Sequence, residues 1–179
     1  IFASLTVHCG TCRLLQDAAE LATLTMDDNM TRVAAVPSIL AIARLPPSVR
    51  AVEVGGEALS QKAIDNVAEG VNIYNYYGPT EVAIWATRRL LTSDSSGPRH
   101  ASIGRPLPNV MYYIVDHESQ TGSPRLQPVG VFGELWLGGG QMARGYLKRP
   151  EKTADVFVSH PWTLITPPSR GVVYRTGDR

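Results

Sequence analysis

Two short segments that contain glycine combine residue types suited to binding a nucleotide. Gly55-Gly56 lets the backbone approach a ligand closely, because neither residue carries a Cβ. Tyr76-Tyr77-Gly78-Pro79-Thr80-Glu81 offers aromatic faces for stacking on a base, a hydroxyl donor for a phosphate oxygen and a carboxylate of the kind that holds Mg²⁺ beside phosphates. Asp178, which follows Thr176-Gly177, could accept hydrogen bonds from a ribose diol. Together these residues outline a nucleotide site.

Each of these pieces also has an ordinary structural explanation. Gly-Gly and Gly-Pro pairs are common in turns, the tyrosines could belong to the core, and Glu81 could be a solvated surface carboxylate. An aspartate that follows a glycine is itself a common turn residue. The nucleotide site is therefore a hypothesis that depends on whether the fold brings the pieces together.

The first hundred residues alternate strand-like and helix-like segments, which is typical of a parallel α/β sheet. In an open sheet of this kind, the loops at the carboxyl ends of neighbouring strands meet at the ligand crevice. Both glycine segments follow predicted strands, so we expect them at that edge. The predicted elements are a strand over 32–36, a short helix capped by Ser38 and reaching Ala43, a strand over 49–54, a helix from Ser60 to about Ala68, and a strand over 71–77.

The pattern changes after a polar loop over residues 92–100, where the expected strands become antiparallel. The predicted elements are strands over 109–115, 131–137 and 172–175, with one helical turn at 150–154. The sequence therefore predicts an α/β fold with two parts. Residues 1–100 would form a partial parallel-sheet subdomain, and residues 101–179 a smaller β-rich subdomain of the distorted-barrel kind.

The composition excludes several classes of protein. The 179 residues are 44% apolar, and 17 Lys and Arg balance 16 Asp and Glu, for a net charge of +1. Such apolar content can build a core, and the near-neutral charge leaves no excess of cations for nucleic acid or an anionic membrane. No apolar run reaches the ~20 residues that a membrane-spanning helix needs, and the start shows no secretory leader. We expect a cytoplasmic protein that binds neither nucleic acid nor membrane.

Two further motifs suggest other chemistry but lack the context that it needs. The segment 138–143 matches the G-x-G-x-x-A dinucleotide fingerprint, yet Gly145 interrupts any following helix and Val158 stands where an acidic ribose ligand is expected. Cys9 and Cys12 form a C-x-x-C pair without a second pair of ligands, so we expect a reduced structural pair and not a zinc site. A dinucleotide-dependent oxidoreductase remains a distant alternative.

Taken together and in order, the motifs resemble the adenylation domain of nonribosomal peptide synthetases, within the wider family of adenylate-forming enzymes. The resemblance covers nearly the whole chain. It implies an enzyme that activates an amino acid with ATP and Mg²⁺ to an aminoacyl-adenylate, then loads it onto the phosphopantetheine thiol of a peptidyl carrier domain, alongside condensation domains. The signatures are Gly55-Gly56-Glu57-Ala58-Leu59, Asn75-Tyr76-Tyr77-Gly78-Pro79-Thr80-Glu81, Ile103-Gly104-Arg105-Pro106, Gly133-Glu134-Leu135-Trp136-Leu137-Gly138-Gly139, Ala143-Arg144-Gly145-Tyr146-Leu147 and Tyr174-Arg175-Thr176-Gly177-Asp178.

The resemblance also implies roles for single residues. Asn75 would meet the adenine edge, Tyr77 would stack on the ring and Asp178 would bind the ribose hydroxyls. Thr80 would contact the α-phosphate and Glu81 would hold Mg²⁺, so these two are the expected catalytic residues. Metal and polar donors would offset the charge that develops as a carboxylate attacks the α-phosphorus. The full expected nucleotide-binding set is Gly55, Gly56, Glu57, Asn75, Tyr76, Tyr77, Gly78 and Asp178.

The same comparison implies where the substrate side chain would lie. Val54, Tyr76 and Trp85 are bulky for such a pocket, so we expect a small or compact apolar amino acid. The comparison also interprets Gly138 to Gly140, Arg144 and Tyr146 as structural supports of the β-rich part. The expected pocket residues are Ala35, Val52, Val54, Tyr76, Ile84 and Trp85.

Several parts of the family pattern fall outside this sequence. They are the Gly-rich phosphate loop, the acidic residue that recognises the amino group, and the C-terminal subdomain with its catalytic lysine. We therefore interpret the chain as an internal fragment and expect no catalysis from these 179 residues alone. Two alternatives stay open: an acyl-CoA or aryl-acid ligase of the same superfamily, and a noncatalytic nucleotide-binding module.

Overall fold

The computed structural model describes residues 12–13, 20, 29–92, 102–116, 123–162 and 171–179. Two compact units account for the chain: residues 1–73 with 92–100, and residues 74–91 with 101–179. The subdomain boundary near residue 100 stays a prediction, because compactness by itself does not define a domain boundary. The expectation that Cys9 and Cys12 are a reduced structural pair also stays a prediction, since Cys9 lies outside the described residues.

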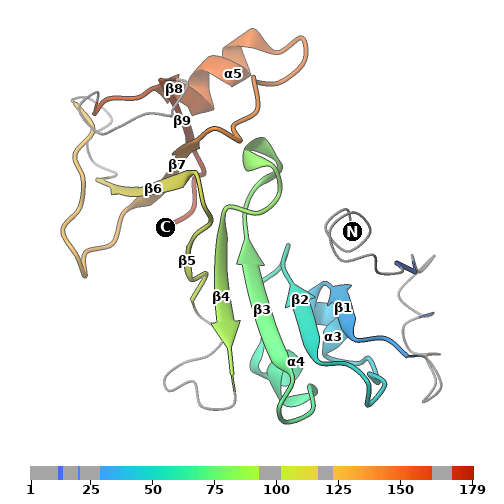
Figure 1. Cartoon of the computed structure of the whole chain (residues 1–179). Coiled ribbons are helices and arrows are strands. Elements are labelled where there is room, and N and C mark those ends of the chain that lie inside the picture. Colours follow the sequence, from blue (N-terminus) through green and yellow to red (C-terminus); the bar gives the residue numbers. More distant parts are fainter. Residues whose placement is uncertain (1–11, 14–19, 21–28, 93–101, 117–122, 163–170) are drawn as a thin grey trace. The chain divides into compact units, whose positions relative to one another are not determined.

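In the part of it that the structure describes, the first unit contains a parallel pair of strands and two short helices (Figure 1). Strand β1 (Arg32–Ala35) pairs in parallel with β2 (Ala51–Val54), with Val33 opposite Val52. Helix α3 (Pro37–Leu40) lies between the two strands in the chain, and helix α4 (Gln61–Asp65) follows β2. Their apolar residues are buried, as a crossover helix on a parallel sheet requires. The buried side chains are Val33, Leu40, Val52, Val54, Ala63 and Ile64.

The predicted start of α4 at Ser60 is correct to within one residue, whereas the predicted cap of α3 at Ser38 was wrong. Ser60 caps α4, because its hydroxyl accepts the N–H of Ala63 at 3.2 Å. Ser38 lies inside α3 and caps nothing; Val36 occupies the N-cap position without a side-chain bond. The backbone N–H and hydroxyl of Ser38 instead donate to the carboxylate of Glu57, at 3.0 and 3.1 Å. A distant carboxylate therefore satisfies the start of α3.

Both helices end earlier than the sequence predicted. Helix α4 stops at Asp65, three residues before Ala68, and α3 stops at Leu40. The amide of Asn66 donates to the carbonyls of Leu40 and Ala43, at 2.8 and 2.6 Å. This side chain satisfies carbonyls that the end of α3 leaves without helical partners, and it fixes the end of α4 against them.

The second unit begins within β3 (Asn72–Tyr77), whose first two residues belong to the first unit. A loop with a 3-10 turn at Thr80–Val82 leads to β4 (Thr87–Leu91). Strand β4 pairs antiparallel with the two-residue strand β5 (Arg105–Pro106). Neither β4 nor β5 was predicted. Strand β4 has the burial pattern of a strand, with Thr87 and Leu91 buried and Arg88 and Leu90 exposed, but its two arginines and polar first residue hid this in the sequence.

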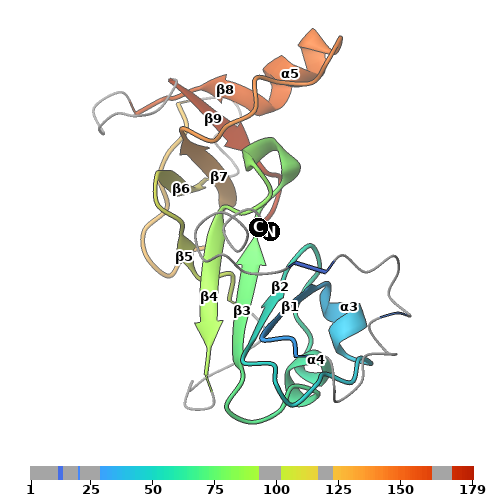
Figure 2. The same ribbon diagram turned by 45° about the vertical axis from the view of Figure 1, so that its right-hand side comes forward.

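The remaining strands form an antiparallel sheet in the order β6-β7-β9-β8 (Figure 2). Strand β6 is Val110–Val115, β7 is Glu134–Gly139, β8 is Phe157–Ser159 and β9 is Val172–Arg175; helix α5, Pro150–Val156, precedes β8. The predicted strand over 131–137 starts too early, because Val131 and Phe132 are exposed. No helix begins after Gly139 until Pro150, which confirms that the dinucleotide fingerprint lacks its helix. The β-rich prediction for this part is confirmed.

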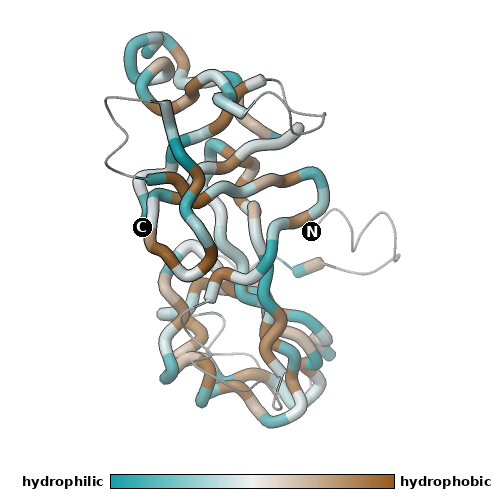
Figure 3. Tube along the Cα trace, turned by 90° about the vertical axis from the view of Figure 1, so that its left-hand side faces the viewer, coloured by the Kyte–Doolittle hydropathy of each residue, from teal (hydrophilic) through white to brown (hydrophobic). Residues whose placement is uncertain are grey.

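This sheet separates two apolar clusters. One contains Leu135 and Leu137 with Val82 and Ala86, and the other contains Trp136 and Val173 with Tyr113. Leu137 and Val173 are fully buried. Figure 3 colours the trace by hydropathy, and hydrophobic segments in brown are interspersed with hydrophilic segments in teal along the chain. No helix in the described part of the chain has both the length and the apolar character to span a membrane.

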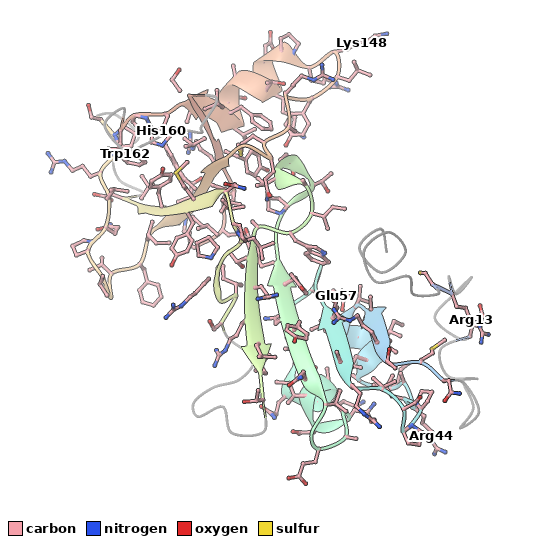
Figure 4. All side chains as sticks on the ribbon, viewed as in Figure 1. Arg13, Arg44, Glu57, Lys148, His160 and Trp162 are labelled. Carbon is pink, nitrogen blue, oxygen red and sulfur yellow. The ribbon has the colours of Figure 1, made fainter. Side chains whose placement is uncertain are left out.

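A buried histidine completes the second cluster (Figure 4). The N–H of Trp162 donates to Nδ1 of His160 at 3.2 Å, so Nδ1 carries no hydrogen and Nε2 carries it. Nε2 lies 2.9 Å from the hydroxyl oxygen of Tyr113, which accepts from it and in turn donates to the sulfur of Met111 at 3.4 Å. The imidazole is thus satisfied at both nitrogens within a core.

Candidate nucleotide and metal site

The loop between β3 and β4 presents Glu81 and is tightly constrained. Gly78 has no room for a side chain: a Cβ there would lie 2.4 Å from the carbonyl oxygen of Ile84 and 2.5 Å from the N–H nitrogen of Ala86. Ala83 and Ile84 both adopt left-handed backbone angles, with φ of 54° and 74°. A β-branched residue at positive φ is strained, at a cost of roughly 1–3 kcal/mol, and such strain is concentrated at functional sites. The loop shape is therefore imposed by its surroundings.

A second loop, residues 140–146, holds the first one in place. The N–H of Ala143 donates to the backbone carbonyl of Glu81 at 2.8 Å. The amide of Gln141 donates to the carbonyls of Val82 and Trp85, both at 2.9 Å. The hydroxyl of Tyr146 donates to the carboxylate of Glu81 itself. No spacing signal in the sequence predicts these contacts, because the two loops lie about 60 residues apart in the chain.

The carboxylate of Glu81 is half-buried and kept ionised. Burial raises its pKa, but hydrogen bonds from Tyr146, its own backbone and Tyr174, together with the positive charge of Lys152, lower the pKa overall. Conversely, the hydrogen bond to Glu81, followed by burial, raises the pKa of the Tyr146 phenol. At neutral pH the pair is therefore a neutral donor and an anionic acceptor.

Tyr77 and Asp178 come together at the end of β3, from positions 101 residues apart. The phenol hydroxyl of Tyr77 donates to the Asp178 carboxylate, and burial, followed by this hydrogen bond and the carboxylate charge, raises the pKa of Tyr77. Asp178 is exposed, and its own N–H donates to Thr176 Oγ1 at 3.0 Å. Its carbonyl accepts from the N–H of Leu135 at 2.9 Å. The segment around Asp178 is thus attached to β7, and the side-chain carboxylate of Asp178 faces Tyr77.

The other predicted residues of the second unit have definite places. Asn75 is buried, and its amide donates to the carbonyl of Ser102 at 3.1 Å. The rings of Tyr76 and Trp85 lie 5.1 Å apart at 33°, so these two expected pocket residues contact each other. Ile84 is 58% exposed, and Thr80 is also exposed, with no side-chain hydrogen bond to the described residues.

The remaining predicted residues belong to the first unit. Gly56 has a φ of +85°, which glycine tolerates, whereas Gly55 is buried. Glu57, labelled in Figure 4, holds the start of α3 through Ser38. Val52 and Val54 are fully buried, and Ala35 is half-buried. The expected roles of these residues toward ATP and the substrate stay predictions.

The donors present fit a magnesium ion held together with phosphates. Mg²⁺ in nucleotide sites commonly binds one or two carboxylates and completes its shell with phosphate oxygens and water. Glu81 supplies one ionised carboxylate, and the described residues contain no group of three or more His, Cys, Asp or Glu that would form an all-protein cage. A single ionised carboxylate therefore suits a magnesium ion that takes its other ligands from nucleotide phosphates and water.

The comparisons with known proteins agree with this fold. Residues 3–147 match the model of the family described as AMP-binding enzyme. The chain is 38% identical over 172 residues to gramicidin S synthase 2 of Aneurinibacillus migulanus, covering 91% of this chain, and 39% identical over 156 residues to nonribosomal peptide synthetase 1 of Aspergillus fumigatus, covering 84%. This chain belongs to the AMP-binding enzyme family.

A solved structure gives the same result for the fold. It is a four-domain nonribosomal peptide synthetase bound to AMP and glycine, 30% identical, with a TM-score of 0.69 over 90% of this chain and 12% of the other. The mixed α/β fold predicted from the sequence is confirmed. The resemblance to the adenylation domain of nonribosomal peptide synthetases is confirmed as well. The chain spans only 4% of the length of the gramicidin synthase and 2% of the length of the Aspergillus synthetase.

Proposed function

We propose that this chain is part of an adenylation domain that activates an amino acid with ATP and Mg²⁺, forming an aminoacyl-adenylate and pyrophosphate. The observation that carries the proposal is the arrangement within the second unit. Two carboxylates from distant parts of the chain, Glu81 and Asp178, are each held by a tyrosine hydroxyl. One carboxylate suits a metal ion and the other a ribose diol.

The chain's own residues have complementary tasks in this reaction. Tyr77 offers a ring face to adenine while its hydroxyl orients Asp178 toward the ribose. Glu81 is ionised and oriented before any ligand arrives, which suits electrostatic catalysis, because no reorganisation is then needed as charge develops. Thr80 lies exposed beside Glu81, where its hydroxyl can donate to a phosphate oxygen. Mg²⁺ would neutralise phosphate charge at this point.

We further propose the substrate class and partners of the complete protein. Tyr76 and Trp85 are bulky and contact each other, which favours a small or compact apolar amino acid in the pocket that the family resemblance implies. By the family resemblance, the activated acyl group passes to a phosphopantetheine thiol on a peptidyl carrier domain, next to a condensation domain. Reliance on ATP and on a carrier thiol suits a reaction in the cytoplasm.

The test is ATP–pyrophosphate exchange by the complete protein across amino acids, aryl acids and fatty acids, with Glu81→Gln as the inactive comparison. Exchange with one compact apolar amino acid, strongly reduced in the variant, supports the whole proposal. Exchange with a large or charged amino acid would refute the substrate class alone. Exchange only with acids that lack an α-amine would favour an acyl-CoA or aryl-acid ligase, and ATP binding without exchange would favour a noncatalytic module.

A further inference from the structure

Tyr146 lies outside the residues for which the sequence predicts a role in the reaction, yet its hydroxyl donates to the Glu81 carboxylate. We propose that Tyr146 is a positioning residue for magnesium: it holds the Glu81 carboxylate in the orientation in which the metal–nucleotide complex meets it. This inference rests on the proposed function, because it assigns Tyr146 to the same metal site. It adds to the sequence-based interpretation of Tyr146 as a support of the β-rich part, which stays a prediction.

Helix α5 fixes the backbone of Tyr146 through a hydrogen bond. The N–H of Tyr146 donates to Thr153 Oγ1 at 2.9 Å, and this hydroxyl donates to the carbonyl of Arg149 at 2.8 Å. The loop and helix can approach this closely because residue 145 is a glycine with a φ of +136°. A Cβ on Gly145 would lie 2.4 Å from Thr153 Cγ2. The position of Tyr146 is therefore set by packing and not by Glu81 alone.

The ring of Tyr146 is also held on its sides. Phe157 packs against it with ring centroids 5.9 Å apart at 70°, and the ammonium nitrogen of Lys152 lies 4.6 Å from the ring centroid. A cation over an aromatic face is attracted to it, so Lys152 helps to fix the ring. The hydroxyl therefore reaches Glu81 from a ring whose direction is fixed.

A site with one protein carboxylate depends strongly on the orientation of that carboxylate. The metal's other ligands are phosphates and water, so Glu81 alone would transmit the protein's geometry to the ion. A positioning contact of this kind commonly changes metal affinity by about 10-fold to 100-fold when it is removed. Tyr146 would make a positioning contact of this kind, because its hydroxyl bonds the carboxylate of Glu81, the proposed metal ligand, and not the metal ion.

The experiment compares nucleotide affinity with and without metal in the complete protein. Calorimetry measures ATP binding in excess Mg²⁺ and again in EDTA, for the natural protein and for Tyr146→Phe, which keeps the ring and its packing. Tyr112→Phe is the control, because Tyr112 is 42% exposed on β6 and loses the same hydroxyl. We expect Tyr146→Phe to reduce the magnesium-dependent gain in ATP affinity about tenfold, with metal-free binding within about twofold of natural, and Tyr112→Phe to change neither.

A double-mutant cycle tests whether Tyr146 acts through Glu81. In a Glu81→Gln background, Tyr146→Phe should change the magnesium-dependent gain by less than about twofold, because the group that it positions is gone. Equal weakening with Mg²⁺ and with EDTA, an additive effect in the double variant, or an unchanged gain would each overturn the inference while leaving the proposed function intact. A natural protein whose ATP binding ignores Mg²⁺ would overturn both.

Discussion

Replacing Gly104 by alanine should damage this protein far more than the same replacement at Gly130. Both glycines have left-handed backbones, with φ of +84° and +88°. At Gly104 a Cβ would lie 2.1 Å from the carbonyl oxygen of Arg88, on the neighbouring strand β4, whereas at Gly130 it would meet nothing within 4 Å. The two variants therefore share the cost of the backbone conformation and differ only in the steric clash.

The expected magnitudes follow from these contacts. An L-residue in the left-handed region costs about 1–2 kcal/mol, which applies to both variants. At position 104 the backbone must also move away from β4, and two neighbouring hydrogen bonds are then at risk. They run from Thr87 Oγ1 to the carbonyl of Ile103 at 2.6 Å and from the Asn75 amide to the carbonyl of Ser102 at 3.1 Å. At about 1 kcal/mol each, Gly104→Ala should cost about 3–4 kcal/mol.

Hydrogen exchange in the complete protein measures this locally, since a single unfolding temperature is not defined for a multidomain chain. Peptides that cover β4 should exchange much faster in Gly104→Ala and at the natural rate in Gly130→Ala. ATP affinity should fall in the first variant as well, because Asn75 loses its support. Equal exchange in the two variants would refute the reasoning, because it would mean that the steric clash is relieved without cost.

Three further outcomes are expected. Tyr77→Phe removes the hydroxyl that orients Asp178, so the KM for ATP should rise several-fold, and a modest effect is expected since Asp178 is exposed; an unchanged KM would mean that the contact is irrelevant to nucleotide binding. Tyr113→Phe leaves Nε2 of buried His160 without an acceptor, so heat inactivation should occur earlier by the equivalent of about 1–3 kcal/mol; unchanged inactivation contradicts the assigned tautomer. Because the pKa of Glu81 is lowered, its ionised form contributes above the ordinary glutamate value of about 4.3 and is lost only as the pH falls through the lower folded value; a decline of magnesium-dependent ATP binding between about pH 7 and 5 that is present in the natural protein and absent from Glu81→Gln would contradict this.

Local pattern in the sequence was enough to place most of the secondary structure. Strands β1, β2, β3 and β6 were each predicted to within two residues, and β9 was predicted without error, because alternating or β-branched runs bounded by turn residues favour strands. Strands β4, β5 and β8 were missed, and β4 and β5 have polar and charged residues where a buried strand would be apolar. Thr87 is nevertheless fully buried, because its hydroxyl finds the carbonyl of Ile103. A satisfied polar group of this kind carries no sequence signal.

Cap positions show how a tertiary contact overrides a local rule. Ser38 and Ser60 look alike in the sequence, each just before a helix-like run. Ser60 caps its helix through its own hydroxyl, whereas Ser38 donates to Glu57 from the first turn of α3. Local reasoning cannot foresee a carboxylate 19 residues away. The same contact gives Glu57 a structural partner that the family resemblance did not suggest.

In the candidate site, too, the sequence identified the types of residue but not the contacts between them. Tyr77, Glu81 and Asp178 were identified from their chemistry, and the family resemblance ordered them, but neither source assigned Tyr146 a role beyond support. Its importance arises from two loops that meet only in the folded second unit, where Ala143 bonds the backbone of Glu81 and Tyr146 bonds its side chain. Both contacts come from one loop and act on one residue. Moving that loop would therefore move the carboxylate, and this ties the proposed metal site to helix α5 through continuous hydrogen bonding and packing.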